Sequence, residues 1–244
     1  MILQKYEFLD KEFQNDDVKK YYSILEKRKI SLVVKRLFDF FVSLIMTIFF
    51  LPIFLILALA IKIDSKGPVL FRQERVTTYG KVFRIYKFRT MVANAESLGT
   101  QVTVNNDMRV TRVGRVLRKY RLDETPQLFN ILKGEMSFVG TRPEVPRYVD
   151  SYTDDMYATL LLPAGVTSLA SICYKDEERL LSESENANET YIEKILPEKM
   201  KYNLKYIETF SFWNDIKLMF MTVAAVLKKE EEQTVEEVKE VTKV

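Results

Sequence analysis

The sequence predicts an α+β protein that is mainly helical, has a small β-hairpin or sheet, and enters a membrane with one helix. Residues 40–61 form the one apolar run long enough for the hydrocarbon core of a bilayer, which takes roughly 20 residues. Two stretches rich in Val, Phe, Ile and Tyr, with a Gly-containing loop between them, predict the hairpin. Apolar residues elsewhere recur at helical spacing, which predicts amphipathic helices, some of them at the membrane interface.

The 244 residues suffice for one domain with appendages. We divide the chain into an N-terminal extension (1–34), a membrane helix (35–64), a cytoplasmic domain (65–228) and a charged C-terminal tail (229–244). Apolar residues of the extension recur at helical spacing, which predicts a solvated or surface-lying helix with these positions on one face: Val18, Tyr21, Tyr22 and Leu25. The apolar run begins too late in the chain for a signal peptide, and no small-residue cleavage site follows it.

Pro52 lies near the middle of the apolar run and determines its expected shape. A proline inside a helix removes a backbone hydrogen bond, and its ring clashes with the carbonyl of Ile48, so the helix should kink or break there. Basic residues flank both ends of the run, and the positive-inside rule places either flank in the cytoplasm. They are Lys27, Arg28, Lys29, Lys35 and Arg36 before it and Lys62, Lys66, Arg72 and Arg75 after it. We therefore favour a re-entrant helix broken at Pro52 over a transmembrane span, and both over a buried helix of a soluble core.

Turn signals and apolar patterns predict the elements that follow the run. Residues 68–76 and 81–91 are the two strands of the hairpin, closed by the loop 77–80. A basic amphipathic helix begins at Arg109, and a second helix, 127–134, ends with a glycine at its C-cap.

Two further segments, 144–162 and 215–228, are also predicted to be helical. The apolar part of the second, residues 218–227, is too short to span a bilayer. It should therefore pack on the core or lie at the membrane interface.

The composition removes several classes of site. The chain has no histidine, which excludes Ser-His-Asp and Cys-His nucleophile systems and histidine metal sites. Its single cysteine, Cys173, cannot form an internal disulfide or a zinc cluster and fits a reducing compartment. A net charge of +3 does not indicate nucleic-acid binding, but the basic excess between residues 27 and 121 suits anionic lipid headgroups or a phosphate-rich substrate.

Two adjacent carboxylates, Asp123 and Glu124, lie between the basic helix and Pro126. Taken alone, this spacing is well explained by Asp123 as an N-cap, with Glu124 and Pro126 in the first helical turn. The chemical interpretation needs the basic surroundings, which would keep a carboxylate ionised and bind an anionic substrate. An ionised carboxylate can attack phosphorus, and its neighbour can hold Mg²⁺ together with substrate phosphates. Beside a membrane segment, this pattern indicates phosphate chemistry on a lipid.

Several separate motifs occur in an order that resembles the bacterial sugar transferases, the monotopic polyprenyl-phosphate phosphoglycosyl transferases. They are KRLFDFFVSLI, LPIFLILALAIKIDSKGPVLFRQERV, IYKFRTM and VTRVGRVLRKYRLDETPQLFNILKGEMSFVGTRP. The resemblance runs from about Lys35 to Arg147 and continues more weakly to Val223. It implies transfer of a sugar 1-phosphate from a UDP-sugar to undecaprenyl (polyprenyl) phosphate, with release of UMP, through a phosphosugar–aspartyl intermediate and with Mg²⁺ as cofactor.

The resemblance also implies a place for the enzyme and its partners. The catalytic domain, 65–228, would work at the cytoplasmic face of the bacterial inner membrane, in contact with membrane lipids. Its product would initiate a membrane-linked glycan (capsule, O-antigen, exopolysaccharide or glycoprotein), which downstream glycosyl transferases would extend. No nucleic acid is expected as a partner.

By the same resemblance, individual residues acquire roles. Asp123 is the nucleophile, Glu124 supports the metal or the nucleophile, and both belong to the Mg²⁺ site. Phosphate or nucleotide contacts fall on a set of basic residues: Lys87, Arg89, Arg118, Arg142 and Lys175. Pro52 is the position at which the family's membrane helix breaks.

The chain departs from the family at positions that bear on sugar specificity more than on reaction type. Leu51 replaces a serine that often precedes the breaking proline, and Thr141 replaces the first proline of a Pro-Arg-Pro motif. The loop PAGVTSLASICYK differs from the common PGITGxAQVNGR, so the sugar is not predicted. Two other functions stay open: a non-catalytic, membrane-anchored, anion-binding scaffold with Asp123 as a cap, and phosphate hydrolysis on the same surface.

Overall fold

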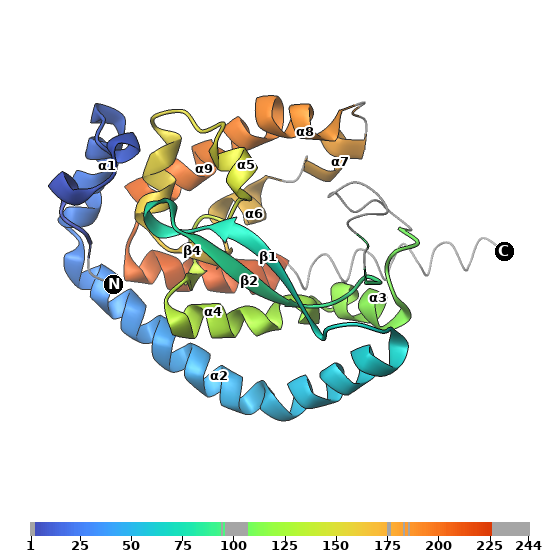
Figure 1. Ribbon diagram of the computed structural model, residues 1–244. Helices are drawn as coiled ribbons and strands as arrows, with labels where there is room; N and C mark the ends of the chain where they lie inside the picture. The colour runs from blue at the N-terminus through green and yellow to red at the C-terminus, as the bar shows by residue number, and fades with distance from the viewer. Residues whose placement is uncertain are drawn as a thin grey trace.

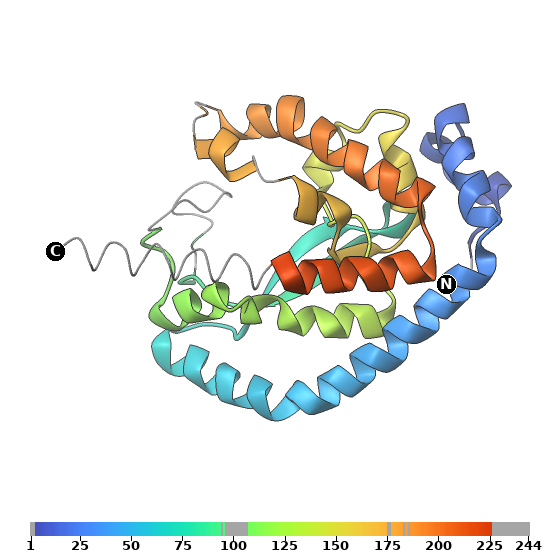
Figure 2. The same cartoon turned by 180° about the vertical axis from the view of Figure 1, so that it is seen from behind.

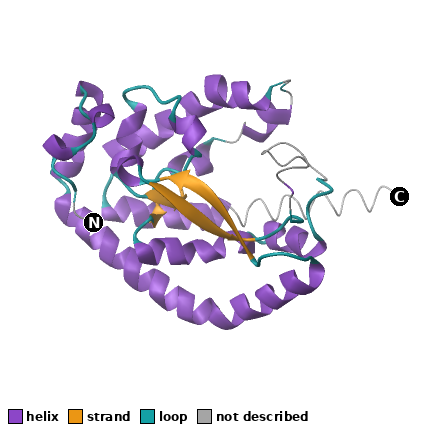
Figure 3. Ribbon diagram, viewed as in Figure 1, coloured by secondary structure: helices purple, strands orange, loops and turns teal. Residues whose placement is uncertain are grey.

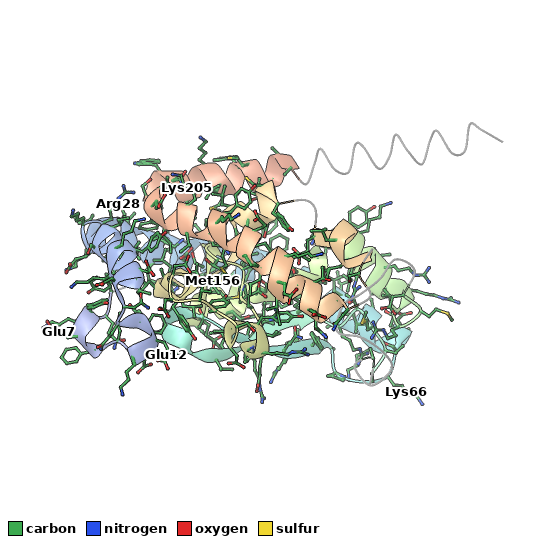
Figure 4. The ribbon with its side chains drawn as sticks, turned by 90° about the horizontal axis from the view of Figure 1, so that it is seen from above. Glu7, Glu12, Arg28, Lys66, Met156 and Lys205 are labelled. Carbon is green, nitrogen blue, oxygen red and sulfur yellow. The ribbon has the colours of Figure 1, made fainter. Side chains whose placement is uncertain are left out.

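One long helix, α2 (Lys29–Asp64), runs along the edge of the molecule, and the other elements lie on its inner side (Figure 1). The computed structural model describes residues 3–93, 95, 107–174, 177–182, 184 and 186–225. Arg28 and Lys66, which flank α2, lie at opposite ends of the molecule (Figure 4). The mainly helical α+β class is confirmed, with short strands at the centre (Figure 3).

The predicted hairpin is confirmed, with strands shorter than expected. β1 (Leu70–Val76) pairs antiparallel with β2 (Val82–Phe88), and the turn between them is η3 (Thr78–Gly80). A second sheet was not predicted: β3 (Met136–Val139) pairs in parallel with β4 (Ala164–Thr167). A strand of four residues is too short to show a clear alternation of apolar and polar residues. Its partner is also distant in the chain, so no hairpin turn marks the pair.

Helices make up most of the remaining described chain. In chain order the α-helices after α2 are α3 (Arg112–Lys119), α4 (Leu128–Lys133), α5 (Pro146–Val149), α6 (Leu169–Cys173), α7 (Glu177–Ser182), α8 (Ala187–Thr190), α9 (Leu196–Glu208) and the helix 212–225. The 3₁₀ segments η5 (Leu122–Gln127) and η6 (Met156–Leu161) and the π-helical η7 (Tyr191–Ile195) lie between them. Helix 212–225, seen from behind in Figure 2, contacts β4 through a hydrogen bond of 2.7 Å between the Thr222 and Thr167 hydroxyls.

The N-terminal extension forms the expected surface-lying helix, α1 (Asp16–Glu26). The positions expected on one face are all buried: Val18, Tyr21, Tyr22 and Leu25. Asn15 caps the helix by accepting a hydrogen bond from the Val18 N–H at 2.8 Å. The buried face of α1 contacts η6 and α9, so the extension shares a hydrophobic core with the C-terminal half of the chain.

Helix α2 bends near its middle but stays continuous through Pro52 (Figure 1). Of the predicted kink or break, the break at Pro52 is therefore wrong, and the bend agrees with a kink. A proline deprives the helix of one N–H donor, and the hydrogen bonds of the neighbouring turns hold the helix across that gap. Thr47 donates to the Ser43 carbonyl at 2.7 Å in the turn before the proline, a contact that also bends helices.

In the described part of the chain, α2 is the one helix long and apolar enough, by length and composition, to cross a membrane. Many of its large apolar side chains are exposed: Phe40, Phe41, Leu44, Ile45, Ile48, Phe49, Leu51, Leu55, Ile56, Leu59 and Ile63. Both of its ends turn toward the rest of the chain, while its middle lies at the outer edge (Figures 1 and 2).

A polar stripe on α2 faces the domain. Lys35, Asp39, Ser43 and Thr47 recur every four residues and are all buried. The Lys35 ammonium donates to the Val139 carbonyl at 2.7 Å and pairs with Asp215 at 2.6 Å. Lys35 belongs to the basic flank that precedes the apolar run, but its ammonium is buried and paired, so its expected place at a membrane surface is wrong.

The segments around the predicted carboxylate motif follow expectation in part. Helix α3 begins after its N-cap, Thr111, three residues later than predicted, and α4 ends as predicted at Gly134, which has a left-handed φ of 83°. Of the predicted helix 144–162, only the short α5 and the 3₁₀ segment η6 form. Short apolar stretches separated by turns can mimic a helical period over such a range.

Candidate active site

Four separate segments bring charged side chains together at one place. Lys87 lies on β2, Arg118 near the end of α3, Asp123 and Glu124 on η5, and Arg142 just after β3. Segment η5 packs against β2 and between α3 and α4. A hydrophobic core beneath it fixes these elements against α2: Phe54, Ile61, Ile85, Leu117 and Ile131.

The capping interpretation of Asp123 is wrong. Arg121 occupies the cap position, with a left-handed φ of 55°, and Asp123 lies inside the 3₁₀ segment, without a capping hydrogen bond. The left-handed turn at Arg121 costs free energy for a side chain with a Cβ. It ends α3 abruptly and turns the two carboxylates toward β2.

Glu124 forms ion pairs with two basic side chains. The Lys87 ammonium and the Arg142 guanidinium each donate to the same oxygen, Oε1, at 2.7 Å. Burial opposes ionisation of this carboxyl, but Arg142 and Lys87 outweigh it and hold its pKa well below the usual range. Burial lowers the pKa of Lys87, and the charge of Glu124 partly offsets this shift. Both side chains of the pair are largely shielded from solvent.

Asp123 has different surroundings from its neighbour. In the described part of the chain, no hydrogen bond or ion pair to another residue engages its carboxylate. Burial, and next the charge of Glu124, raise its pKa, while Lys87 and Arg118 act in the opposite direction. A carboxylate that is partly desolvated and not held by a donor is available to bind a metal or attack an electrophile.

Arg118 and a residue that the sequence analysis missed, Thr90, form the next contact. The Arg118 Nε donates to the Thr90 hydroxyl at 2.9 Å, which orients the guanidinium beside Asp123. Burial lowers the pKa of Arg118, and the charge of Asp123 opposes this shift. Thr90 lies within the predicted second strand, but its role depends on α3 crossing close to it. A Cβ added to Gly114 would lie 2.0 Å from the Thr90 carbonyl oxygen.

Arg89 is close to the site in sequence but is not part of the Glu124 contact. Its Nη2 donates to the Ser65 carbonyl at 2.7 Å and to the Ser65 hydroxyl at 2.9 Å, at the end of α2. The side chain is buried, and its Nε and Nη1 have no hydrogen-bond partner among the residues described. Buried donors of this kind call for an acceptor, and a phosphate oxygen would satisfy them.

Two further positions were predicted from the sequence, Lys175 and Pro52. Lys175 is outside the described residues. Pro52 lies within α2 and takes no part in the contacts of the carboxylate pair.

Gln127, at the end of η5, is a residue that sequence reasoning missed. It is 1% exposed, and both polar atoms of its amide lack a hydrogen-bond partner in the described structure. The adjacent sequence Asp-Glu-Thr-Pro holds no signal for it, because burial of this side chain follows from the packing of η5.

The carboxylates of the site are the candidate ligands for the expected Mg²⁺ ion. Among the residues described, no group of three or more Asp, Glu, Cys or His could hold a metal ion alone. Mg²⁺, however, is commonly bound through one or two carboxylates together with substrate phosphates and waters. The unpaired Asp123 carboxylate beside Glu124 fits that mode of binding.

These contacts define a class of site. Cations from three segments surround a carboxylate that has no partner among the described residues, on a domain joined to a long apolar helix, and such a site is suited to binding phosphate. The family profile described as "Bacterial sugar transferase" matches residues 30–229, and the chain belongs to this family. The resemblance noted in the motifs is thereby confirmed.

Curated relatives agree with this assignment. The chain is 39% identical over 198 residues to the UDP-N-acetylgalactosamine-undecaprenyl-phosphate N-acetylgalactosaminephosphotransferase of Aeromonas hydrophila, covering 80% of this chain and 44% of the relative. It is 38% identical over 198 residues to the UDP-glucose:undecaprenyl-phosphate glucose-1-phosphate transferase of Klebsiella pneumoniae, covering 80% and 40%. A Caulobacter vibrioides protein of the latter name is 36% identical over 196 residues, covering 79% and 69%. The chain thus spans less than half the length of the first two relatives.

Proposed function

We propose that this protein is a phosphoglycosyl transferase that moves a sugar 1-phosphate from a UDP-sugar to undecaprenyl phosphate and releases UMP. The observation that carries the proposal is the difference between the two carboxylates: Glu124 pairs with Lys87 and Arg142, while the Asp123 carboxylate has no partner among the residues that the structure describes. Family membership and the names of the relatives support the reaction class.

In the first step, an Asp123 carboxylate oxygen attacks the sugar-bearing phosphorus of the UDP-sugar. A bond from Asp123 to phosphorus forms, the bond from that phosphorus to the bridging oxygen breaks, and UMP departs with that oxygen and the electron pair. Lys87, Arg118 and Arg142 supply the positive charge that the phosphates require.

In the second step, a phosphate oxygen of undecaprenyl phosphate attacks the same phosphorus. The diphosphate linkage of the lipid product forms, and the bond to Asp123 breaks, which restores its carboxylate. Neither step requires a proton to be removed from the nucleophile, which agrees with the absence of histidine from the chain. The lipid-linked product would be the substrate of downstream glycosyl transferases.

Asp123, with Glu124 beside it, is the proposed Mg²⁺ site. A bound magnesium ion would neutralise charge on the substrate phosphates. Arg89 lies at the end of α2, and two of its buried donors have no partner in the described structure, so it is proposed as a further phosphate contact.

We further propose that α2 is re-entrant and that the domain works at the cytoplasmic face of the membrane. The bend and the exposed apolar side chains of α2 support this topology (Figure 1). Exposed Trp213 and Phe220 on helix 212–225, and Val116 and Tyr120 around the end of α3, would then lie at the interface with the lipid headgroups.

The test is UMP release by membranes or detergent-solubilised protein given undecaprenyl phosphate and, in turn, UDP-N-acetylgalactosamine, UDP-glucose and UDP-galactose. These sugars occur in the names of the relatives. We expect UMP release with at least one donor and a phosphosugar adduct on the peptide that contains Asp123. Asp123→Asn keeps the size of the side chain and should abolish both. An active Asp123→Asn variant would refute the nucleophile, and no UMP from a broader donor panel would favour the anion-binding scaffold.

A further inference from the structure

A second ionic cluster, which the proposed reaction does not use, is built around Glu144, which follows Arg142 closely in the chain. The Tyr191 hydroxyl donates to a Glu144 carboxylate oxygen at 2.6 Å, and the Lys199 ammonium donates to the Tyr191 oxygen at 2.8 Å. Lys199 lies 3.5 Å from Glu144 and 3.3 Å from Glu177. The side chains of Glu144 and Lys199 are only 6% and 8% exposed. We call Glu144, Tyr191 and Lys199 the Glu144 cluster.

This cluster completes a set of contacts around residues 141–144. The Thr141 carbonyl accepts a hydrogen bond from the Gly165 N–H at 2.8 Å, on the side of β4. On the side of β1, the Glu144 carbonyl accepts from the Val76 N–H at 2.9 Å, and the Pro143 carbonyl accepts from Arg75 at 3.0 Å. The Glu144 side chain adds the third direction, toward η7 and α9, so the segment that carries Arg142 is held from three sides.

A buried ionic cluster is a costly way to stabilise a fold. Taking a carboxylate and an ammonium out of water costs free energy, and well-packed apolar residues of the same volume are often as stable. A buried ionic cluster does, however, define one geometry, because its hydrogen bonds have fixed directions. Glu124 and, to a lesser extent, Glu144 and Glu177 raise the pKa of Arg142, while burial opposes them, so these carboxylates also lie within electrostatic reach of its guanidinium.

We propose that Glu144, Tyr191 and Lys199 are positioning residues that hold Arg142 in place for the diphosphate of a nucleoside diphosphate sugar. The inference rests on the proposed function for the identity of that substrate. Lys199 and Tyr191 act on Arg142 through Glu144. A displacement of about 1 Å in such a group is enough to weaken a catalytic contact markedly. The cluster is therefore expected to affect the donor substrate and not the lipid acceptor.

The test compares Lys199→Met and Tyr191→Phe with a matched control, Lys201→Met, on the same helix. Lys201 is 69% exposed and pairs with exposed Glu198. Two readouts are measured: the KM values for the UDP-sugar and for undecaprenyl phosphate, and hydrogen–deuterium exchange of a peptide covering residues 140–145. For Lys199→Met we expect a KM for the UDP-sugar raised about tenfold, as for 1.4 kcal/mol of lost binding, an unchanged KM for the lipid, and faster exchange. Tyr191→Phe should show the same pattern to a smaller degree, and Lys201→Met should match the wild type.

The outcomes separate the two proposals. Exchange and KM values equal to those of Lys201→Met would overturn the positioning role. An equal rise in both KM values, or faster exchange without a change in the KM for the UDP-sugar, would also overturn it. If the wild type releases no UMP from any donor, the proposed function fails, and hydrogen–deuterium exchange alone tests this inference. Unchanged exchange in both cluster variants would then overturn the inference as well. Faster exchange would support the role of the Glu144 cluster in fixing the segment that carries Arg142. Should Lys199→Met not fold, the milder Tyr191→Phe decides.

Discussion

Asp123 and Glu124 are neighbours in the chain, but their surroundings separate their ionisation. The pKa of Asp123 is raised, first by burial and then by Glu124, whereas Arg142 and Lys87 hold the pKa of Glu124 low. Pairs of carboxyl groups whose pKa values are driven apart commonly divide their roles in catalysis. Here the free carboxylate suits attack, and the paired one suits the orientation of cations.

Glu124→Gln should lower the rate of UMP release about 100-fold, the scale expected for loss of one electrostatic stabiliser. The amide keeps the size of the side chain but removes the charge that holds Lys87 and Arg142. Steady-state kinetics provide the measurement. Glu74→Gln is the control, since Glu74 is exposed and pairs with exposed Arg84. A Glu124→Gln enzyme as active as this control would contradict the proposed role.

Chelation of divalent metal should abolish UMP release without unfolding the protein. The candidate ligands are Asp123, Glu124 and the phosphates of the substrate, so the ion is not expected to support the fold. We expect activity to disappear in EDTA, to return with Mg²⁺, and the thermal midpoint of the substrate-free protein to stay unchanged. Full activity in EDTA would show that the site works without the metal.

At the scale of elements, α2 holds the two halves of the site together. Arg36 donates to the Ile131 and Leu132 carbonyls at the end of α4, at 2.7 and 2.9 Å, and Asp39 accepts from the Phe138 N–H at 3.2 Å. These contacts and the Lys35 contact with Val139 all fall on residues 131–139, which link the carboxylate pair to Arg142. The long apolar helix thus also fixes the spacing of the site.

Lys35→Met should destabilise the protein by about 3 kcal/mol, because it leaves Asp215 buried without its cation. The double variant Lys35→Met/Asp215→Asn should recover part of this loss, since the remaining amide can still accept from Tyr206. Thermal or denaturant unfolding in detergent measures both. Lys29→Met, at an exposed pair with Glu26, should change stability by about 0.5 kcal/mol or less. A double variant no more stable than Lys35→Met would argue against the pair.

At the scale of the whole molecule, exposed apolar surface is concentrated on α2 and helix 212–225. A large, contiguous apolar patch on the surface of a folded chain marks a contact with lipid or with another molecule. A re-entrant α2 would bring the site to the level of the headgroups, where a cytoplasmic nucleotide sugar and a lipid phosphate can meet. A span would leave one end of α2 on the other side of the membrane.

Cysteine labelling distinguishes the two topologies. In a Cys173→Ser background, Lys29→Cys and Lys66→Cys place thiols at exposed positions near the two ends of α2. We expect neither to react with a membrane-impermeant maleimide added to intact cells, and both to react in inside-out vesicles. Labelling of Lys29→Cys from outside would refute the re-entrant helix.

Much of the local structure could be predicted because its signals are local. The hairpin, the Gly134 cap, the buried face of α1 and the apolar run follow from periods and turn residues within a few positions of one another. The parallel β3–β4 pair and the continuity of α2 through Pro52 depend on more distant contacts or on the competition of many hydrogen bonds.

The sequence by itself determined which residue types could carry the chemistry: a carboxylate pair and basic side chains, with no histidine to compete. Only the tertiary structure decided how they divide the work. It places Arg142 and Lys87 on Glu124, sends Arg89 to the end of α2, and buries Lys35 against Asp215. The physical reason is that the pKa and the interaction energy of a charged group depend on its partners and on its exposure to water. Segments that are distant in the chain determine both.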